Sequence, residues 1–155
     1  MQRSFTDTNG KKWTPKMTLF EAARIKRNVD INIEDFDDIQ KMIQNPFLLC
    51  DTLYIVCEDE ATKCKISAEQ FGKSLAGDAI KAARESLLMA ISDFFEAPGK
   101  RIAFMEMTES LNEQGELTIK MIEENTEKMK ESIRREGEAN RKKIMAMLGN
   151  STSGE

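Results

Sequence analysis

The sequence predicts a mainly α-helical protein, with an N-terminal β-hairpin, a small helical bundle and a long charged C-terminal helix. Three observations predict this architecture. Between residues 45 and 95, apolar side chains recur at three-, four- and seven-residue intervals, as they do on helix faces. Near the N-terminus, an Asn-Gly pair separates two short segments and marks a hairpin turn. Residues 101–148 have helix-forming composition and contain no proline.

The hairpin is expected to span residues 4–14. A two-residue turn at its Asn-Gly pair would place Thr6 opposite Trp13. A three-residue loop ending in a left-handed Gly10 instead places Phe5 opposite Trp13. An aromatic pair on one face is the better cross-strand contact, so the longer loop is preferred. Because an isolated hairpin is marginal in water, its aromatic face is expected to dock on the helices.

Two short helices are expected after the hairpin. Thr18 and Glu21 form a capping-box pattern that opens a helix ending near Val29. The modest apolar side of this helix comprises Leu19, Ala22, Ala23, Ile25 and Val29. The next helix is expected over residues 33–43, with its acidic side chains near the N-terminus, where negative charge is favourable. Its inward side chains are Phe36, Ile39, Met42 and Ile43.

The stretch over residues 45–95 is expected to organise the bundle. Asn45 is a favourable N-cap, and Pro46 fits the first position of the helix that follows. The apolar face of this helix comprises Phe47, Leu48, Leu49, Leu53, Tyr54, Val56 and Cys57. Ser67 and Gln70 repeat the capping-box pattern and start a short helix. The predicted arrangement therefore has a long helix followed by a short one.

A second long helix is expected from an Asp78 cap to Pro98-Gly99, where proline and glycine end it. Its apolar face comprises Ile80, Ala83, Leu87, Leu88, Ile91, Phe94 and Phe95. The two long helices must bury their broad faces against each other or against a third surface. The predicted core comprises Leu49, Leu53, Val56, Leu87, Ile91 and Phe94.

Apolar side chains become sparser after residue 100. The sequence therefore predicts a core domain over 1–100, an extended charged helix over 101–148 and a disordered end over 149–155. The first apolar side chains of the extended helix still look able to pack: Ile102, Phe104, Met105, Met107 and Leu111. A heptad register can be drawn further along through Ile119, Ile122, Met129, Ile133 and Met147. The same register includes Thr126, Glu136, Asn140 and Lys143, which are too polar for a stable coiled-coil seam.

Residues 116–148 are therefore expected to form a solvated helix that is marginal alone and ordered by a partner. The candidate partner-binding residues are Ile119, Ile122, Met129 and Ile133. Self-association of this region is left open.

No catalytic, metal or cofactor site is expected. The chain contains no histidine, which is the commonest general base, and no serine or cysteine lies beside a plausible base. Asp30, Asn32 and Glu34 resemble the start of a calcium loop. That loop requires glycine at its sixth position and glutamate at its twelfth, where this chain has Asp35 and Lys41. The sequence therefore indicates a protein that is not an enzyme.

The charge distribution and the hydropathy of the chain indicate which classes of partner and which location to expect. Residues 1–29 carry seven Lys/Arg and two Asp/Glu, whereas residues 30–60 carry nine Asp/Glu and one lysine. These two surfaces could attract each other within the fold, or they could steer a partner. Nucleic acid is not expected, because the basic residues are few and lack interleaved aromatic side chains. No membrane span or signal peptide is evident, so an intracellular location is expected.

Three segments resemble small phage proteins known as tail assembly chaperones. These segments are FTDTNGKKW at residues 5–13, NPFLLCDTLYIVC at 45–57 and ISAEQFGKSLAGDAIKAARESLLMAISDFF at 66–95. They are similar to that family's F-x-D-x-x-G-x-x-W hairpin, its D/N-P-x-x-L…LY-x-L-C helix and its F-G-x-x-L-x-G-D-x-I-x-x-A helix. The resemblance covers residues 5–96 and ends there, and its motifs are structural.

The resemblance implies a non-enzymatic assembly factor of long-tailed phages. Such proteins bind the long helical tape measure protein, keep it soluble, recruit tail tube subunits and leave before the virion is complete. The expected location is the cytoplasm of the infected bacterial host, and the protein is not expected in the mature virion. Many such families also produce a longer form by translational frameshifting, and the charged region from residue 101 could correspond to that extension. Two alternatives remain, a tail or neck component that stays in the virion and a helical adaptor that binds a host protein.

Overall fold

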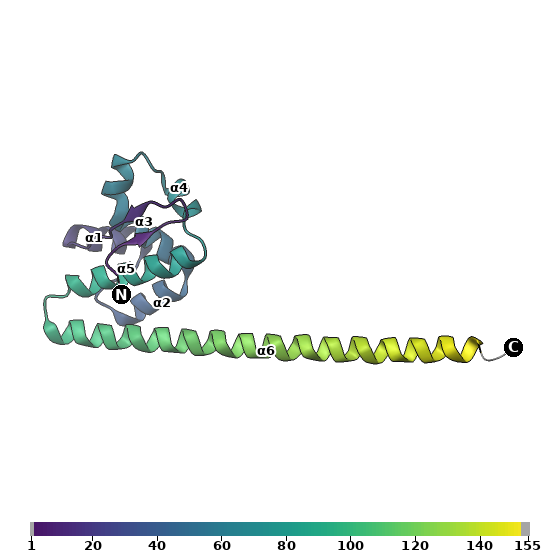
Figure 1. The fold of residues 1–155 in the computed structure, drawn as a ribbon. Coiled ribbons are helices and arrows are strands. Elements are labelled where there is room, and N and C mark those ends of the chain that lie inside the picture. The colour runs from purple at the N-terminus through teal and green to yellow at the C-terminus, as the bar shows by residue number, and fades with distance from the viewer. Residues whose placement is uncertain (1, 153–155) are drawn as a thin grey trace. The chain divides into compact units, whose positions relative to one another are not determined.

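The computed structural model describes residues 2–152, with side chains over residues 2–149. It confirms a mainly helical fold with an N-terminal hairpin and a long C-terminal helix (Figure 1). In chain order the elements are β1 (Phe5–Thr6), β2 (Lys12–Trp13), α1 (Leu19–Val29), α2 (Phe36–Gln44), α3 (Pro46–Lys63), α4 (Ala68–Lys73), α5 (Asp78–Phe94) and α6 (Pro98–Thr152). The chain divides into two compact units, here called the core unit (Met1–Thr108) and the helical extension (Glu109–Glu155).

The hairpin has the register that the longer loop predicts. Strands β1 and β2 are antiparallel, with Phe5 opposite Trp13 and Thr6 opposite Lys12. Gly10 closes the loop with φ of 82°, a left-handed conformation that glycine adopts without strain. The three-residue loop is therefore confirmed, although each strand is only two residues long.

A buried carboxylate holds the hairpin loop together. Asp7 Oδ1 accepts hydrogen bonds from the backbone N–H groups of Asn9 and Lys11, both at 2.9 Å. Asp7 Oδ2 accepts a hydrogen bond of 2.8 Å from Trp13 Nε1. Burial by itself raises the pKa of Asp7, but these hydrogen bonds, with a further one from Ser74, outweigh burial and leave the pKa below its ordinary 3.8. The charged form of Asp7 therefore stabilises the loop.

The aromatic face of the hairpin docks on the helices. Trp13 is fully buried, and its ring meets the ring of Phe71 on α4 edge-on, with centroids 5.0 Å apart. Tyr54 on α3 lies against the same Phe71 ring at 5.5 Å. The backbone N–H and hydroxyl of Thr8 both donate to the carbonyl of Ser74 at 3.0 Å. Figure 1 shows the hairpin, in purple, beside α3 and α5, and β1 contacts α5.

Helix α3 is the centre of the core unit, since it contacts α1, α2, α4 and α5. Its N-terminus forms as predicted, with Pro46 in the first turn and Asn45 Oδ1 accepting from the N–H groups of Phe47 and Leu48. Its buried side chains lie on most sides of the helix: Leu49, Thr52, Leu53, Ile55, Val56, Cys57 and Ala61. A helix that is apolar around most of its circumference must be covered by several neighbours.

Local capping sets the other helix boundaries. The capping boxes at Thr18 and Ser67 are both present. Helix α2 begins at residue 36, three residues later than predicted, because the Asp35 side chain caps it and accepts from the N–H of Asp37. The predicted Asp78 cap is wrong. Gly77 is the N-cap residue of α5, with φ of 54° and ψ of −128°, a conformation that only glycine tolerates.

The predicted core is confirmed at five of its six positions, Leu49, Leu53, Val56, Leu87 and Ile91. The sixth, Phe94, is only partly buried. Its neighbour Phe95 is buried instead, because the chain leaves the helix at Phe95 and turns that ring towards Phe104, 5.3 Å away. Phe94 is the last residue of α5, so its helical position was predicted correctly and only its burial was not.

Three large apolar side chains of α1 and α3 are exposed, Leu19, Phe20 and Phe47. Ile102 of α6, which was expected to pack, is exposed as well. Leu19 and Phe47 were predicted to be inward-facing, and this is wrong. All three lie in the first turn of α1 or α3. Because helical side chains tilt towards the N-terminus, those of the first turn project past the end of the helix instead of onto its neighbours.

The first turns of α6 belong to the core unit. Phe104 is fully buried, with its ring 6.2 Å from that of Phe36 and 5.3 Å from that of Phe95. Arg101 Nη2 donates to the carbonyl of Phe95 at 2.7 Å. The compact unit thus ends at Thr108, eight residues beyond the boundary that the sequence suggested. At the other end, residues 149–152 are helical although a disordered end was expected, and residues 153–155 lie outside the described residues.

The basic N-terminal segment and the acidic middle of the chain pair within the core unit. Lys11 Nζ lies 3.1 Å from Glu60 Oε1, and Arg24 forms an ion pair with Glu58. Glu34 of the acidic middle pairs instead with Lys100 in the first turn of α6, at 3.5 Å. Of the two interpretations of the uneven charge, mutual attraction within the fold is therefore supported by these contacts.

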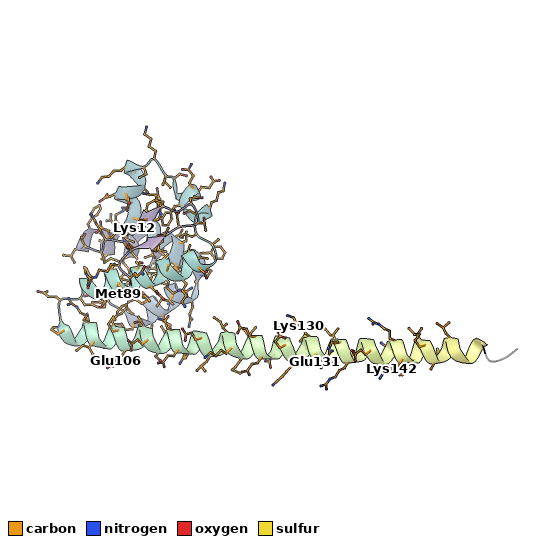
Figure 2. The ribbon with its side chains drawn as sticks, in the orientation of Figure 1. Lys12, Met89, Glu106, Lys130, Glu131 and Lys142 are labelled. Carbon is orange, nitrogen blue, oxygen red and sulfur yellow. The ribbon has the colours of Figure 1, made fainter. Side chains whose placement is uncertain are left out.

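Replacing Trp13 with alanine is expected to lower the free energy of unfolding by about 3 kcal/mol, because it empties a fully buried aromatic site. It also removes the indole donor to Asp7. Urea denaturation of the full chain measures this change. Lys12→Ala, at the exposed neighbouring position of β2 labelled in Figure 2, is the control and is expected to shift stability by less than about 0.5 kcal/mol. A small effect of Trp13→Ala would contradict the docking of the hairpin.

Leu53→Asp is expected to unfold the core unit, because it places an unpaired charge at a fully buried position of α3. The cost is several kcal/mol against a total stability of about 5–15 kcal/mol. Phe47→Asp, on the same helix at an 80% exposed position, is the matched control and is expected to leave the melting temperature nearly unchanged. Equal melting temperatures for the two variants would show that α3 is not the centre of the core.

Asp7→Asn is expected to cost about 1–3 kcal/mol at neutral pH, because one amide oxygen replaces two charged acceptor oxygens. Since the folded-state pKa of Asp7 is lowered, its stabilisation is present above the unfolded pKa and is lost as the pH falls through the folded value. The difference in unfolding free energy between wild type and variant should therefore shrink below about pH 4. Denaturation at a series of pH values tests this, with exposed Asp51→Asn as the control. A difference that does not change with pH would contradict it.

Candidate partner-binding surfaces

The described residues bring together no catalytic constellation or metal cluster. The chain has no histidine, and among the described residues no group of three or more potential metal ligands is placed to hold an ion. Burial raises the pKa of the Cys57 thiol to about 12 and also raises that of Cys50, while Cys64 is exposed. Cys57 is buried as expected, and Cys50 is only partly buried. The features described below are surfaces at which large apolar side chains remain exposed.

The four predicted partner-binding residues lie together on the helical extension. Their side chains are between 56% and 65% exposed, and they are Ile119, Ile122, Met129 and Ile133. Their spacings of three, seven and four residues place them on one side of α6. Large apolar side chains that remain exposed along one side of a helix are the expected feature of a helix that binds another helix. We call this set the apolar stripe.

Charged side chains flank the apolar stripe and pair within the helix. Glu131 accepts from Arg134 at 2.8 Å and from Arg135 at 3.3 Å, and Lys130 pairs with Glu127 at 3.3 Å. Figure 2 shows the side chains of Lys130, Glu131 and Lys142 projecting from α6. Exposed pairs of this kind contribute only about 0.3–0.5 kcal/mol each. No side chain described after Thr108 is buried, so the helical extension gains little from packing.

Further apolar side chains lie outside the stripe. Leu117, Met121 and Met145 are exposed on other sides of the helical extension. Heptad spacing did not include them, and they reduce the contrast between the two sides of the helix. They provide equally exposed positions at which a substitution leaves the stripe intact.

The core unit has a second apolar surface that the sequence did not predict. A cavity of about 320 Å³ lies between the start of α3, α4 and the start of α5. It is lined by Pro46, Phe47, Leu49, Cys50, Leu53, Gly72, Leu75 and Ile80. The sequence analysis did not identify it, because Phe47 was placed on the apolar helix face that was expected to be covered. The position of Phe47 in a first turn, directly after Pro46, was the available signal.

Comparison of the chain with known proteins finds no similar one: no protein family, no curated protein and no solved structure matches it. Among the described residues, no helix is both long enough and apolar enough to cross a membrane. Fold and surface together define a small helical domain, closed by a docked hairpin, that carries a long helix with an exposed apolar stripe.

Deleting residues 116–155 is expected to leave the core unit folded. The compact unit ends at Thr108, which is also the last buried residue among those described. The truncated chain should melt cooperatively within a few degrees of the full chain, because none of the side chains described after Thr108 is buried. Thermal melting monitored by near-ultraviolet circular dichroism of Trp13 measures this. Loss of the cooperative transition on truncation would show that the helical extension is part of the core packing.

Proposed function

We propose that this protein is a non-enzymatic assembly chaperone of a long-tailed phage that binds the tape measure protein and recruits tail tube subunits around it. The observation that carries the proposal is the apolar stripe on the helical extension. A stripe of Ile119, Ile122, Met129 and Ile133, with more than half of each side chain in water, matches the apolar faces of a long helical client.

The energetics of the helical extension favour a role in binding. A solvated helix with few packing contacts loses conformational entropy when it orders, and it buries too little apolar surface to offset that loss. A partner helix that covers the stripe would supply that burial, at about 25 cal/mol for each Å² of apolar surface removed from water. The helical extension would then become ordered on its client and release it readily, since part of the interaction energy is spent on ordering. Reversible binding is what an assembly factor requires.

The resemblance to tail assembly chaperones supports the same proposal. Its three motifs coincide with the hairpin, with the first part of α3 and with the stretch from α4 to the end of α5. In this chain those motifs supply the Trp13 dock, the Asn45 cap and the Gly77 turn, which are determinants of the fold. The motifs account for the shape of the core unit, and the proposal assigns client binding to the helical extension.

The proposal places the protein in the cytoplasm of the infected host and outside the finished virion. The alternative of a structural tail or neck component requires the protein to remain in purified particles. Mass spectrometry of virions distinguishes the two, because a chaperone should be missing from mature particles. The alternative of a host-directed adaptor predicts capture of a host protein and no effect on tape measure solubility.

The direct test is co-expression with the tape measure protein of the same phage. The full chain should raise the soluble yield of the tape measure protein and should co-purify with it. The chain that lacks residues 116–155 should do both less well, although its core unit remains folded. Equal yield and equal capture by the two forms would overturn the assignment of client binding to the helical extension. Failure of both forms would overturn the proposed function itself.

A further inference from the structure

The helical extension carries a longer-range pattern than the apolar stripe. Large aliphatic side chains recur every eleven residues, at Leu111, Ile122, Ile133 and Ile144. The positions between them follow the same four-, three- and four-residue spacing and are occupied by Gly115, Thr118, Thr126, Met129, Gly137 and Asn140. We call the ten positions the eleven-residue seam. It contains no charged residue, whereas the heptad register includes Glu136 and Lys143.

Helix geometry makes this seam nearly straight. Eleven residues advance three turns with a remainder of about 20°, so positions eleven apart stay on one side of an α-helix over a long distance. Residues 111–144 therefore present a continuous seam about 50 Å long. Ile122, Ile133 and Ile144 are all more than half exposed, and Leu111 is partly covered. A Cβ atom added at Gly115 or Gly137 would meet nothing within 4 Å, so another helix could approach the backbone closely at both points.

The charge of the helical extension divides at its middle. Residues 109–127 carry six glutamates and only Lys120, for a net charge of −5. Residues 128–148 carry seven Lys/Arg and three glutamates, for a net charge of +4. Two parallel copies would align like-charged halves, whereas two antiparallel copies would place each acidic half beside a basic half. Such complementarity mainly selects the orientation of a pair.

The spacing of the seam positions is also the same when the chain is read in the opposite direction. Its positions mirror each other about the midpoint between Glu127 and Lys128, where the charge changes sign. In an antiparallel pair centred there, Ile122 lies opposite Ile133 of the second copy, and Leu111 lies opposite Ile144. The small or short side chains then also face each other, Gly115 opposite Asn140 and Thr118 opposite Gly137. Large positions thus face large ones and short positions face short ones, except at the centre, where Thr126 lies opposite Met129.

We propose that the helical extension pairs with that of a second copy of this chain, antiparallel and centred between residues 127 and 128, through the eleven-residue seam. The pair is two-fold symmetric, so one set of contacts is formed twice. Its eleven-residue period predicts a straight to slightly right-handed pair, unlike the left-handed supercoil of a heptad pair. This proposal does not depend on the proposed function, because it concerns only copies of this chain.

Sedimentation equilibrium of the full chain tests the pairing. We expect a monomer–dimer equilibrium that weakens as salt is raised, because exposed complementary charges are screened. Ile133→Glu should raise the dissociation constant by roughly tenfold or more, since it introduces a charge at two symmetric contacts. Met121→Glu, at a position equally exposed but off the seam, should leave the dissociation constant unchanged. Circular dichroism of both variants confirms that the core unit is folded.

Disulfide cross-linking tests the orientation. Ile122→Cys and Ile133→Cys are introduced into separate chains in a Cys64→Ser background, because the raised pKa values of Cys50 and Cys57 make those thiols poor nucleophiles. The antiparallel pair predicts mixed disulfides between the two chains when they are combined. It predicts little cross-linking of either chain alone, because two identical positions would then lie about 16 Å apart, beyond the reach of a disulfide.

Three results would overturn the proposal. The first is a chain that stays monomeric up to a concentration of about 100 μM. The second is an equal effect of Ile133→Glu and Met121→Glu on self-association, which would place the contact elsewhere. The third is efficient cross-linking of Ile122→Cys chains to themselves, which would show a parallel pair. None of these measurements involves the tape measure protein. A negative result would therefore overturn the pairing without bearing on the proposed function.

Discussion

The fold depends on the burial of one helix on most of its sides. Helix α3 presents apolar side chains around too much of its circumference for a single neighbour to cover, so α1, α2, α4 and α5 all pack against it. The other elements are arranged by that requirement. Phe71 of α4 packs against Tyr54 of α3, and the Trp13 ring of the hairpin packs against the same Phe71 ring. The two-residue strands, which would not persist alone, are ordered by this contact.

The long C-terminal helix is stabilised differently along its length. Its first turns are held by the aromatic cluster of Phe36, Phe95 and Phe104 and belong to the core unit. After Thr108 the same helix has no buried side chain among those described, and its side-chain contacts there include exposed ion pairs between neighbouring turns. Stability is therefore concentrated in the core unit. The helical extension keeps its apolar side chains available for intermolecular contacts.

The client binding and the self-pairing proposed here would use overlapping surfaces. Ile122, Met129 and Ile133 belong both to the apolar stripe and to the eleven-residue seam. A client helix and a second copy of the chain would thus compete for the same side of α6. Pairing would cover the apolar side chains while no client is present, and a client with a longer apolar face would displace it by mass action.

Much of this protein is determined by local sequence. The hairpin register and the caps at Thr18, Asn45 and Ser67 follow from residue spacing, because each depends on neighbours a few positions away. The sequence also predicted that four apolar side chains of α6 are exposed, because the segment around them is too polar to pack. These are Ile119, Ile122, Met129 and Ile133. Only the tertiary structure decided where burial ends. Periodicity identifies a helical face but not whether a neighbour covers it. Leu19 and Phe47 were therefore expected on covered faces although they are exposed, and Phe94 was expected in the core although it is only partly buried. The depth to which α6 enters the core unit was also decided by tertiary contacts, because Phe104 is buried by rings far away in the sequence.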